Sequence, residues 1–218
     1  MIIQLLVDNV NSWFVPYGVS LNKILREMGH KSELLHDHAN VRDGDVLLIL
    51  SCEKIVREHT LNKSKLNLVV HGSDLPEGRG WSPLTWEILA GRSRFCLSLI
   101  EASNKVDAGN VIRKSYFELK GTELNDELKS IQGHEIIKII LEFVRAYPDY
   151  KAIPQEGVPT YYPRRTATDS LLDVDKTIRE QFNLLRVVDN EKYPAFFTMN
   201  GEKYILKIER SSNQEKLT

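Results

Sequence analysis

The chain has 218 residues, enough for one sizeable domain, or one domain with an appendage, around a real core. Its formal net charge is −1, with 29 Lys and Arg against 30 Asp and Glu, so no basic excess argues for a nucleic-acid partner. No apolar run approaches the roughly twenty residues of a membrane span, and a strand pattern begins directly after Met1, so we expect a cytoplasmic protein without a membrane partner. Cys52 and Cys96 are too few and too isolated to indicate a disulfide framework or a metal site, so no metal is predicted.

The first half of the chain alternates strand and helix patterns. Apolar runs predict buried strands at 2–7 and 45–50, and residues 32–35 indicate another strand. A helix is predicted between them, capped by Ser20 and stopped by Gly29, because its apolar residues recur at helical spacing. Strands that alternate with helices predict right-handed βαβ units and a mostly parallel sheet.

The stretch 66–91 stands at the centre of this pattern. A short run rich in β-branched residues predicts a buried strand that delivers His71 to its carboxyl end. A polar loop follows, and Ser82 before Pro83 predicts the N-cap and first position of a helix that ends near Gly91. A polar loop after a buried strand is where open α/β sheets place their ligands.

The second half is predicted to contain two more strands, a long helix and a small module. The strands cover 95–100 and 111–119, and Thr122 is predicted to cap a helix that ends near Tyr147, because Pro148 cannot continue it. A proline-rich connector is predicted over 149–163, followed by a helix at 175–187 and a hairpin at 195–208 around Asn200-Gly201. We therefore expect a first domain at 1–150, the connector, helix and hairpin at 151–210, and a polar tail at 211–218.

Three ordered motifs resemble formyltransferases that use 10-formyltetrahydrofolate. They are His71-Gly-Ser-Asp-Leu-Pro76 with Arg79-Gly80, Pro83 and Trp86; Val106-Asp-Ala-Gly-Asn-Val-Ile112; and Asn183-Leu-Leu-Arg186 with Tyr193-Pro-Ala-Phe196. The resemblance extends from about residue 2 to residue 208 and is closest to bacterial sugar N-formyltransferases of the pseudaminic-acid type. It implies an α/β fold, a Rossmann-like doubly wound sheet, with a small C-terminal α+β appendage.

The resemblance implies transfer of formyl from N10-formyltetrahydrofolate to the amino group of a nucleotide-linked amino sugar, in cell-surface polysaccharide biosynthesis. The partner is then a small molecule, and a homodimer is left open. One alternative is an enzyme like methionyl-tRNA formyltransferase, for which this chain lacks basic surface. Another is a non-catalytic relative that binds folate or a sugar nucleotide. A hydrolase that uses Ser73 is disfavoured, because no G-x-S-x-G motif occurs.

His71 and Asp107 are the predicted catalytic residues. An imidazole can take a proton from an attacking amine near neutral pH, and the resemblance implies that Asp107 orients it and supports its charge. The alternatives are a histidine bonded to backbone at a strand end and a turn aspartate before Gly109. Family members carry an asparagine, an oxyanion donor, where this chain has Val69.

Because residue 69 is a valine, the sequence leaves open which group is the oxyanion donor. Asn67 lies on the same strand face as His71, but about 13 Å away at about 3.3 Å per residue, so it is no simple replacement. Ser51, Asn104 or a backbone amide are candidates, and a site with impaired activity is the alternative.

The resemblance also implies the binding residues. The pterin is expected between the loop after the third strand and the loop before Asp107, which in this sequence correspond to Leu50, Ser51, Cys52, Glu53, Lys54, Asn104, Val106 and Asp107. Both segments are otherwise ordinary βα loops. Substrate contacts are predicted for residues whose aromatic rings could stack on a sugar or base, or whose side chains lie in the motif loop: Trp13, Phe14, Tyr17, Ser73, Arg79, Gly80 and Trp81.

Overall fold

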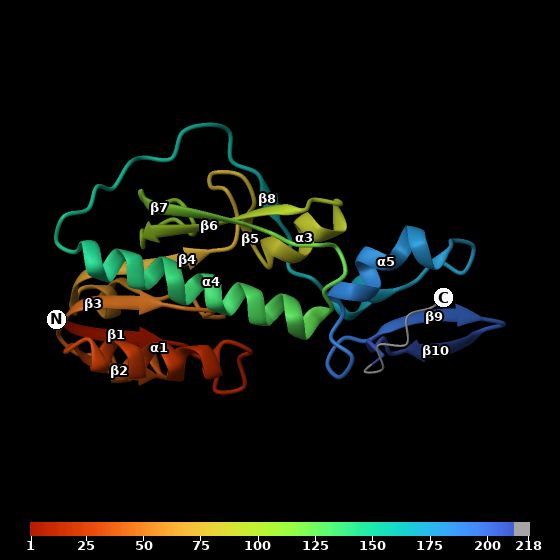
Figure 1. Cartoon of the computed structure of the whole chain (residues 1–218), viewed down its shortest axis with the longest axis horizontal. Helices are drawn as coiled ribbons and strands as arrows, with labels where there is room; N and C mark the ends of the chain where they lie inside the picture. Colours follow the sequence, from red (N-terminus) through yellow and green to blue (C-terminus); the bar gives the residue numbers. More distant parts are fainter. Residues whose placement is uncertain (212–218) are drawn as a thin grey trace.

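A mixed six-stranded sheet forms the centre of the computed structural model, which describes residues 1–211 (Figure 1). In the spatial order β2-β1-β3-β4-β6-β7, the strands are β2 (Lys31–Leu35), β1 (Ile2–Leu6), β3 (Gly44–Ile49), β4 (Ser64–His71), β6 (Arg94–Glu101) and β7 (Val111–Glu118). The first four strands pair in parallel, whereas β6 is antiparallel to both β4 and β7. The predicted mostly parallel α/β sheet is therefore confirmed, with β6 as the reversed strand.

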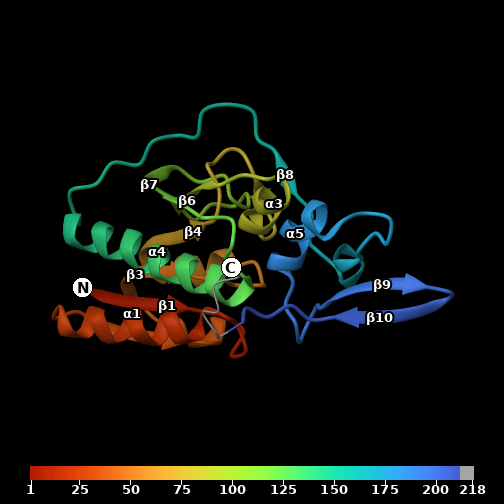
Figure 2. The same ribbon diagram turned by 45° about the vertical axis from the view of Figure 1, so that its right-hand side comes forward.

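Connections cross on both faces of this sheet. Helices α1 (Val15–Glu27) and α4 (Asn125–Ala146) lie together across one face, where their apolar sides bury Leu5, Leu48 and Leu68 (Figures 1 and 2). The other face is covered by the short η1 (His38–Asn40) and α2 (Glu58–Leu61) and their flanking loops, over a second apolar cluster. The chain thus changes direction between the neighbouring strands β1 and β3, as in a doubly wound fold, and ligands of such sheets bind beyond the carboxyl ends of the strands at this point.

Two helix starts differ from the prediction. Helix α1 begins at Val15, with Pro16 in its first turn, so Ser20 lies inside the helix instead of capping it. Helix α4 begins at Asn125, and Leu124, not Thr122, is the N-cap residue. The backbone N–H of Leu124 donates to the Glu127 carboxylate at 2.9 Å, which replaces the expected hydroxyl cap.

The motif loop is followed by helix α3 (Pro83–Leu89). Pro83 takes the first helical position as predicted, and Ser82 is the N-cap residue, but with φ of 48° its side chain makes no capping hydrogen bond. Before this helix, β5 (Arg79–Gly80) pairs in parallel with β8 (Tyr161–Tyr162). The connector from the end of α4 returns past β7 and β6 to form this pair (Figures 1 and 2).

A small C-terminal module follows the connector. It contains η2 (Ala167–Ser170), α5 (Ile178–Val187) and the hairpin of β9 (Ala195–Met199) and β10 (Glu202–Leu206). Asn200 and Gly201 both have positive φ, 53° and 85°, as a two-residue type I′ turn requires, so the predicted hairpin is confirmed. Except for Ser211, the tail expected at 211–218 lies outside the described residues. Within residues 1–211, no helix is long and apolar enough to cross a membrane.

Candidate active site

His71 and Asp107 form a buried pair at the end of β4. The Nδ1 atom of His71 lies 3.4 Å from Oδ1 of Asp107, and the two side chains are only 8% and 9% exposed. His71 is the last residue of β4, while Asp107 comes from the loop between β6 and β7 and has a left-handed φ of 55°. The two residues predicted to be catalytic therefore lie side by side, although 36 positions separate them in the sequence.

The loop that carries Asp107 depends on Gly109. A Cβ atom at this position would lie 1.7 Å from the carbonyl oxygen of Glu101, so only glycine fits against this strand end. Gln155, from the connector, holds the same loop: its Nε2 donates to the carbonyl oxygens of Asp107 and Gly109, both at 2.8 Å. Packing therefore requires the glycine of the Asp-x-Gly motif, which is also part of the resemblance to the family.

Residues 77–80, which we call the clamp segment, contact both members of the pair. The carbonyl oxygen of Gly78 lies 2.8 Å from Nε2 of His71, and the backbone N–H of Gly80 donates to Oδ2 of Asp107 at 2.9 Å. A carbonyl and a carboxylate can only accept, so the two groups that face the imidazole both favour a hydrogen on the ring nitrogen beside them. In this arrangement both ring nitrogens face protein acceptors.

The connector fixes the clamp segment from the other side. Thr160 accepts from the backbone N–H of Gly78 through its hydroxyl at 2.8 Å and from that of Arg79 through its carbonyl at 2.9 Å. A Cβ atom on Gly80, whose φ is 98°, would lie 2.4 Å from the carbonyl oxygen of Tyr162. Thr160 and Gln155 are not among the predicted residues, since a connector without periodicity carries no local signal for such long-range hydrogen bonds.

The predicted cofactor loops flank Val69. Cys52 from the first loop and Ala102, which opens the second, pack with Val69 around one apolar cluster. Ser51 has a left-handed φ of 52°, and the backbone N–H groups of Glu53 and Lys54 donate to the Asp8 carboxylate at 2.9 and 2.8 Å. Leu50 is buried, whereas Asn104 and Val106 are exposed on their loop. Their contact with a pterin stays a prediction.

Two predicted substrate contacts do not fit the structure. Phe14 is fully buried in the core beneath α1 and α4, so its ring is not available to a ligand. Ser73 is also fully buried, and its hydroxyl donates to the carbonyl oxygens of Glu77 and Gly78 at 2.7 and 3.1 Å. Ser73 therefore supports the clamp segment, a role that its place in the motif loop does not reveal.

The remaining substrate candidates occupy different surroundings. Trp13 and Tyr17 are half-buried and pack edge-on against each other. Arg79, next to Gly80, donates to the Gln155 side chain at 2.6 Å. Trp81 is 39% exposed, and the guanidinium of Arg164 lies 4.6 Å from its ring centre.

Arg164 also connects Trp81 to the first cofactor loop. It lies 4.0 Å from the carboxylate of Glu53, so Arg164 of the connector contacts both the motif loop and the loop after β3. A flat ring under a cation is a surface on which a base or sugar could stack.

Two polar residues considered for the oxyanion role, Asn67 and Ser51, have partners elsewhere. Asn67 donates its amide to the carbonyl oxygen of Leu61 at 3.0 Å, and the hydroxyls of Ser51 and Ser12 lie 3.1 Å apart. The protein groups within hydrogen-bonding or ion-pair distance of the His71 ring, among the residues described, are Gly78 and Asp107, and both are acceptors. It therefore stays a prediction that another group takes over the role of the family asparagine when ligands are bound.

The curated relatives that match this chain include methionyl-tRNA formyltransferases. That of Protochlamydia amoebophila is 27% identical over 177 residues, which are 78% of this chain and 55% of the relative. That of Mycoplasmopsis pulmonis is 30% identical over 183 residues, which are 81% of this chain and 60% of the relative. The chain thus spans little more than half the length of these relatives. No protein-family model matches it.

Solved structures share the fold over nearly the whole chain. A methionyl-tRNA formyltransferase from Clostridium thermocellum superposes with a TM-score of 0.80 at 20% identity, covering 98% of this chain and 94% of that one. HypX from Aquifex aeolicus in complex with tetrahydrofolic acid gives 0.78 at 19% identity, over 95% of this chain and 37% of that one. A sugar N-formyltransferase from a Shewanella species gives 0.72 at 12% identity, over 97% and 98%.

The architecture is therefore the Rossmann-like formyltransferase fold, with a buried His–Asp pair at the end of a central strand. The sequence matches and the ordered motifs agree with this fold, so the chain resembles formyltransferases in both sequence and structure.

Proposed function

We propose that the chain transfers a formyl group from N10-formyltetrahydrofolate to the amino group of a nucleotide-linked amino sugar. The observation that carries this proposal is the buried contact of His71 with Asp107, at 3.4 Å, beside a motif loop. The similarity of the chain to formyltransferases in sequence and fold supports the reaction type. The solved HypX complex with tetrahydrofolic acid, which has the same fold, supports the cofactor.

Two features of this chain fit a folate ligand. The loops at 50–54 and 101–107 border the same apolar cluster around Val69, which offers an apolar floor for a flat ring. Side chains from elsewhere in the chain hold the backbone of both loops. The Asp8 carboxylate accepts from the N–H of Glu53 in the first loop, and Gln155 donates to the carbonyl oxygen of Asp107 in the second. When bound there, the cofactor would supply the formyl group.

His71 would act through its Nε2 atom. Nδ1 faces Asp107, whose negative charge stabilises the imidazolium that forms when the ring accepts a proton from the attacking amine. The same proton can then pass to the leaving nitrogen. Because Nε2 now lies against the carbonyl oxygen of Gly78, the clamp segment must release the ring before it can act as a base.

An amino-sugar substrate is favoured over methionyl-tRNA by charge. Proteins that bind tRNA need a basic surface for its phosphates, and this chain carries 29 basic against 30 acidic residues. The exposed face of Trp81 with Arg164 above it suits a nucleotide base or sugar. The second candidate is a methionyl-tRNA formyltransferase-like activity, because the curated sequence relatives include enzymes of that name.

A formyl-transfer assay separates these candidates. The purified chain is incubated with N10-formyltetrahydrofolate and either a panel of uridine- and thymidine-linked amino sugars or methionyl-tRNA, and products are identified by mass. We expect a formylated sugar nucleotide and no formylmethionyl-tRNA. His71→Asn and Asp107→Asn should each lose turnover by about a hundredfold or more.

His59→Asn, at an exposed position on α2, is the matched control and should keep full turnover. Formylation of methionyl-tRNA alone would transfer the assignment to the second candidate. Folate binding without turnover on either substrate would instead identify a non-catalytic relative, and wild-type turnover in His71→Asn would refute the assigned base.

A further inference from the structure

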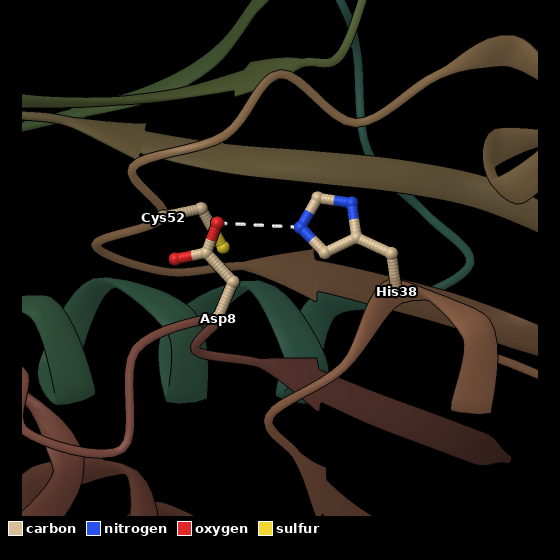
Figure 3. Close-up of side chains that lie close together, drawn as sticks. All are labelled: Asp8, His38 and Cys52. Atoms are coloured by element: carbon tan, nitrogen blue, oxygen red, sulfur yellow. Dashed lines mark hydrogen bonds and ion pairs between the residues drawn. The ribbon is translucent and has the colours of Figure 1, made fainter.

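Three side chains with metal-ligating atoms converge at the carboxyl ends of β2, β1 and β3, away from the His71–Asp107 pair and next to the loop at 50–54 (Figure 3). Asp8 follows β1, His38 lies in η1 after β2, and Cys52 follows β3. These strands are neighbours and run parallel, so their carboxyl ends meet at one edge of the sheet. Spacing along the chain predicts no metal site from the isolated Cys52, because its two neighbours here come from other strands.

The three ligand atoms are close to the separations of a bound metal ion. Nε2 of His38 lies 3.3 Å from Oδ2 of Asp8, and all three ligand atoms lie within 4.8 Å of one another. In a tetrahedral zinc site, bonds of about 2.0–2.3 Å place ligand atoms roughly 3.3–3.6 Å apart. The histidine and the carboxylate already have this separation, and the Cys52 sulfur lies within 4.8 Å of both.

The surrounding backbone orients these ligands. Asp8, whose side chain is 2% exposed, accepts hydrogen bonds from the backbone N–H groups of Glu53 and Lys54. Asp37 caps η1 by accepting from the N–H of Ala39, which fixes the turn that carries His38. Support of this kind from neighbouring groups is what holds ligands of metal sites in position.

The charges also suit a divalent cation. Without one, the Cys52 thiol donates to the carbonyl oxygen of Leu6 at 3.2 Å. A divalent cation would take the place of the thiol proton, and one thiolate and one carboxylate would neutralise its two charges in this largely buried position.

We propose that Asp8, His38 and Cys52 bind a zinc ion, with the fourth coordination position open to water. Sulfur and imidazole ligands favour zinc over magnesium or calcium, which take oxygen ligands. Within residues 1–211, no other three His, Cys, Asp or Glu side chains come together in this way. The ion would tie the ends of three strands together and fix the loop at 51–54.

Zinc titration of the metal-free full chain against a chromophoric chelator tests this proposal. We expect one equivalent bound with a Kd below micromolar. Asp8→Asn, His38→Gln and Cys52→Ser should each weaken binding at least tenfold. Cys96→Ser and His59→Gln, which change a buried cysteine and an exposed histidine elsewhere in the chain, are matched controls and should bind as the wild type does.

Two further readouts distinguish coordination from a structural effect of the substitutions. Calorimetry in buffers of different ionisation enthalpy should show one proton released per zinc from the Cys52 thiol in the wild type and none in Cys52→Ser. Cobalt binding should give a thiolate charge-transfer band that disappears in Cys52→Ser. Absence of stoichiometric binding, or equal affinity and proton release in Cys52→Ser and the wild type, would overturn the proposal.

Discussion

Val69 lies two residues before His71 on β4, so the alternation of the strand directs both side chains to the same face of the sheet. The valine packs with Leu6 and Ile49 in the apolar cluster on that face. An oxyanion donor at this position is usually worth about a hundredfold or more in turnover. Since the rest of the motif is intact, we expect that another donor takes this role once ligands are bound.

Val69→Asn therefore should change turnover by no more than about twofold, because another group is expected to donate to the oxyanion once the ligands are bound. It should also lower the free energy of unfolding by about 1–3 kcal/mol, since an amide enters an apolar cluster. Formyl transfer and urea unfolding measure the two effects. A severalfold gain in turnover would instead identify a site that has lost its donor.

Glu87 is a second residue whose surroundings have a measurable consequence. Its side chain on α3 is nearly fully buried, with Arg92 at 3.6 Å. Burial, opposed by Arg92 and assisted by Asp74 and Glu77, raises the pKa of the Glu87 carboxyl to about 7. The folded protein therefore holds a proton that the unfolded chain, with an ordinary pKa near 4.5, releases.

The stability that this proton contributes is complete below about pH 4.5 and is lost as the pH rises to about 7. Relative to Glu87→Gln, the wild type should lose free energy of unfolding between pH 5 and 8, by on the order of 3 kcal/mol at most. Urea unfolding at several pH values in this window measures the difference. Parallel curves for the two proteins would show that Arg92 keeps Glu87 ionised throughout.

At the scale of elements, the pairing of β5 with β8 joins the connector to the catalytic pair. Gly80 donates to Asp107 and lies against the Tyr162 carbonyl, so its backbone has contacts on both sides. Gly80→Ala should disturb both contacts and reduce formyl transfer at least tenfold, with a loss of stability of about 1–3 kcal/mol.

Gly91→Ala is the matched control, because Gly91 also has a positive φ, 79°, but nothing lies within 4 Å of the added Cβ. It carries the same backbone strain without the clash and should keep its turnover. Equal turnover in the two variants would show that the clamp segment does not position Asp107.

The elements also show where sequence reasoning succeeds. Apolar runs predicted the strands that end in His71 and Leu6, because a buried strand leaves a dense local pattern. The start of α1 was misplaced because Ser20 resembles a cap, whereas Pro16 and the buried Phe14 set the actual start. The β5–β8 pair could not be predicted, since two-residue strands have no periodicity and their partners lie about 80 positions apart.

For the whole molecule, the C-terminal module is joined to the sheet domain by Arg186 and its apolar neighbours. Arg186 of α5 is buried and donates to the Glu123 carboxylate at 2.8 Å and to the Glu123 carbonyl at 3.0 Å. Val187 packs with Leu119 and Leu128 beside it. The arginine of the Asn-Leu-Leu-Arg motif, read from sequence only as a resemblance, is thus a structural link between the module and α4.

Arg186→Ala should lower the free energy of unfolding by about 3–5 kcal/mol, because it leaves the Glu123 carboxylate buried without its counter-ion. Burial alone would raise the pKa of Glu123, but backbone N–H groups of Lys120 and Gly121, together with Arg186, hold it below its usual value. The stability from this carboxylate is therefore present above its ordinary pKa and is lost as the pH falls. This acid sensitivity should weaken in Arg186→Ala.

Urea unfolding at pH 4 and pH 7 measures both effects. Lys207→Ala is the control, because it breaks an exposed ion pair with Glu191 in the same module and should cost less than about 1 kcal/mol. The double variant Arg186→Met with Glu123→Gln should recover part of the loss, since no unpaired charge remains and the single amide oxygen of Gln can still accept from the backbone. A loss in Arg186→Ala no larger than in Lys207→Ala would mean that apolar packing around Val187, not the ion pair, holds the module to α4.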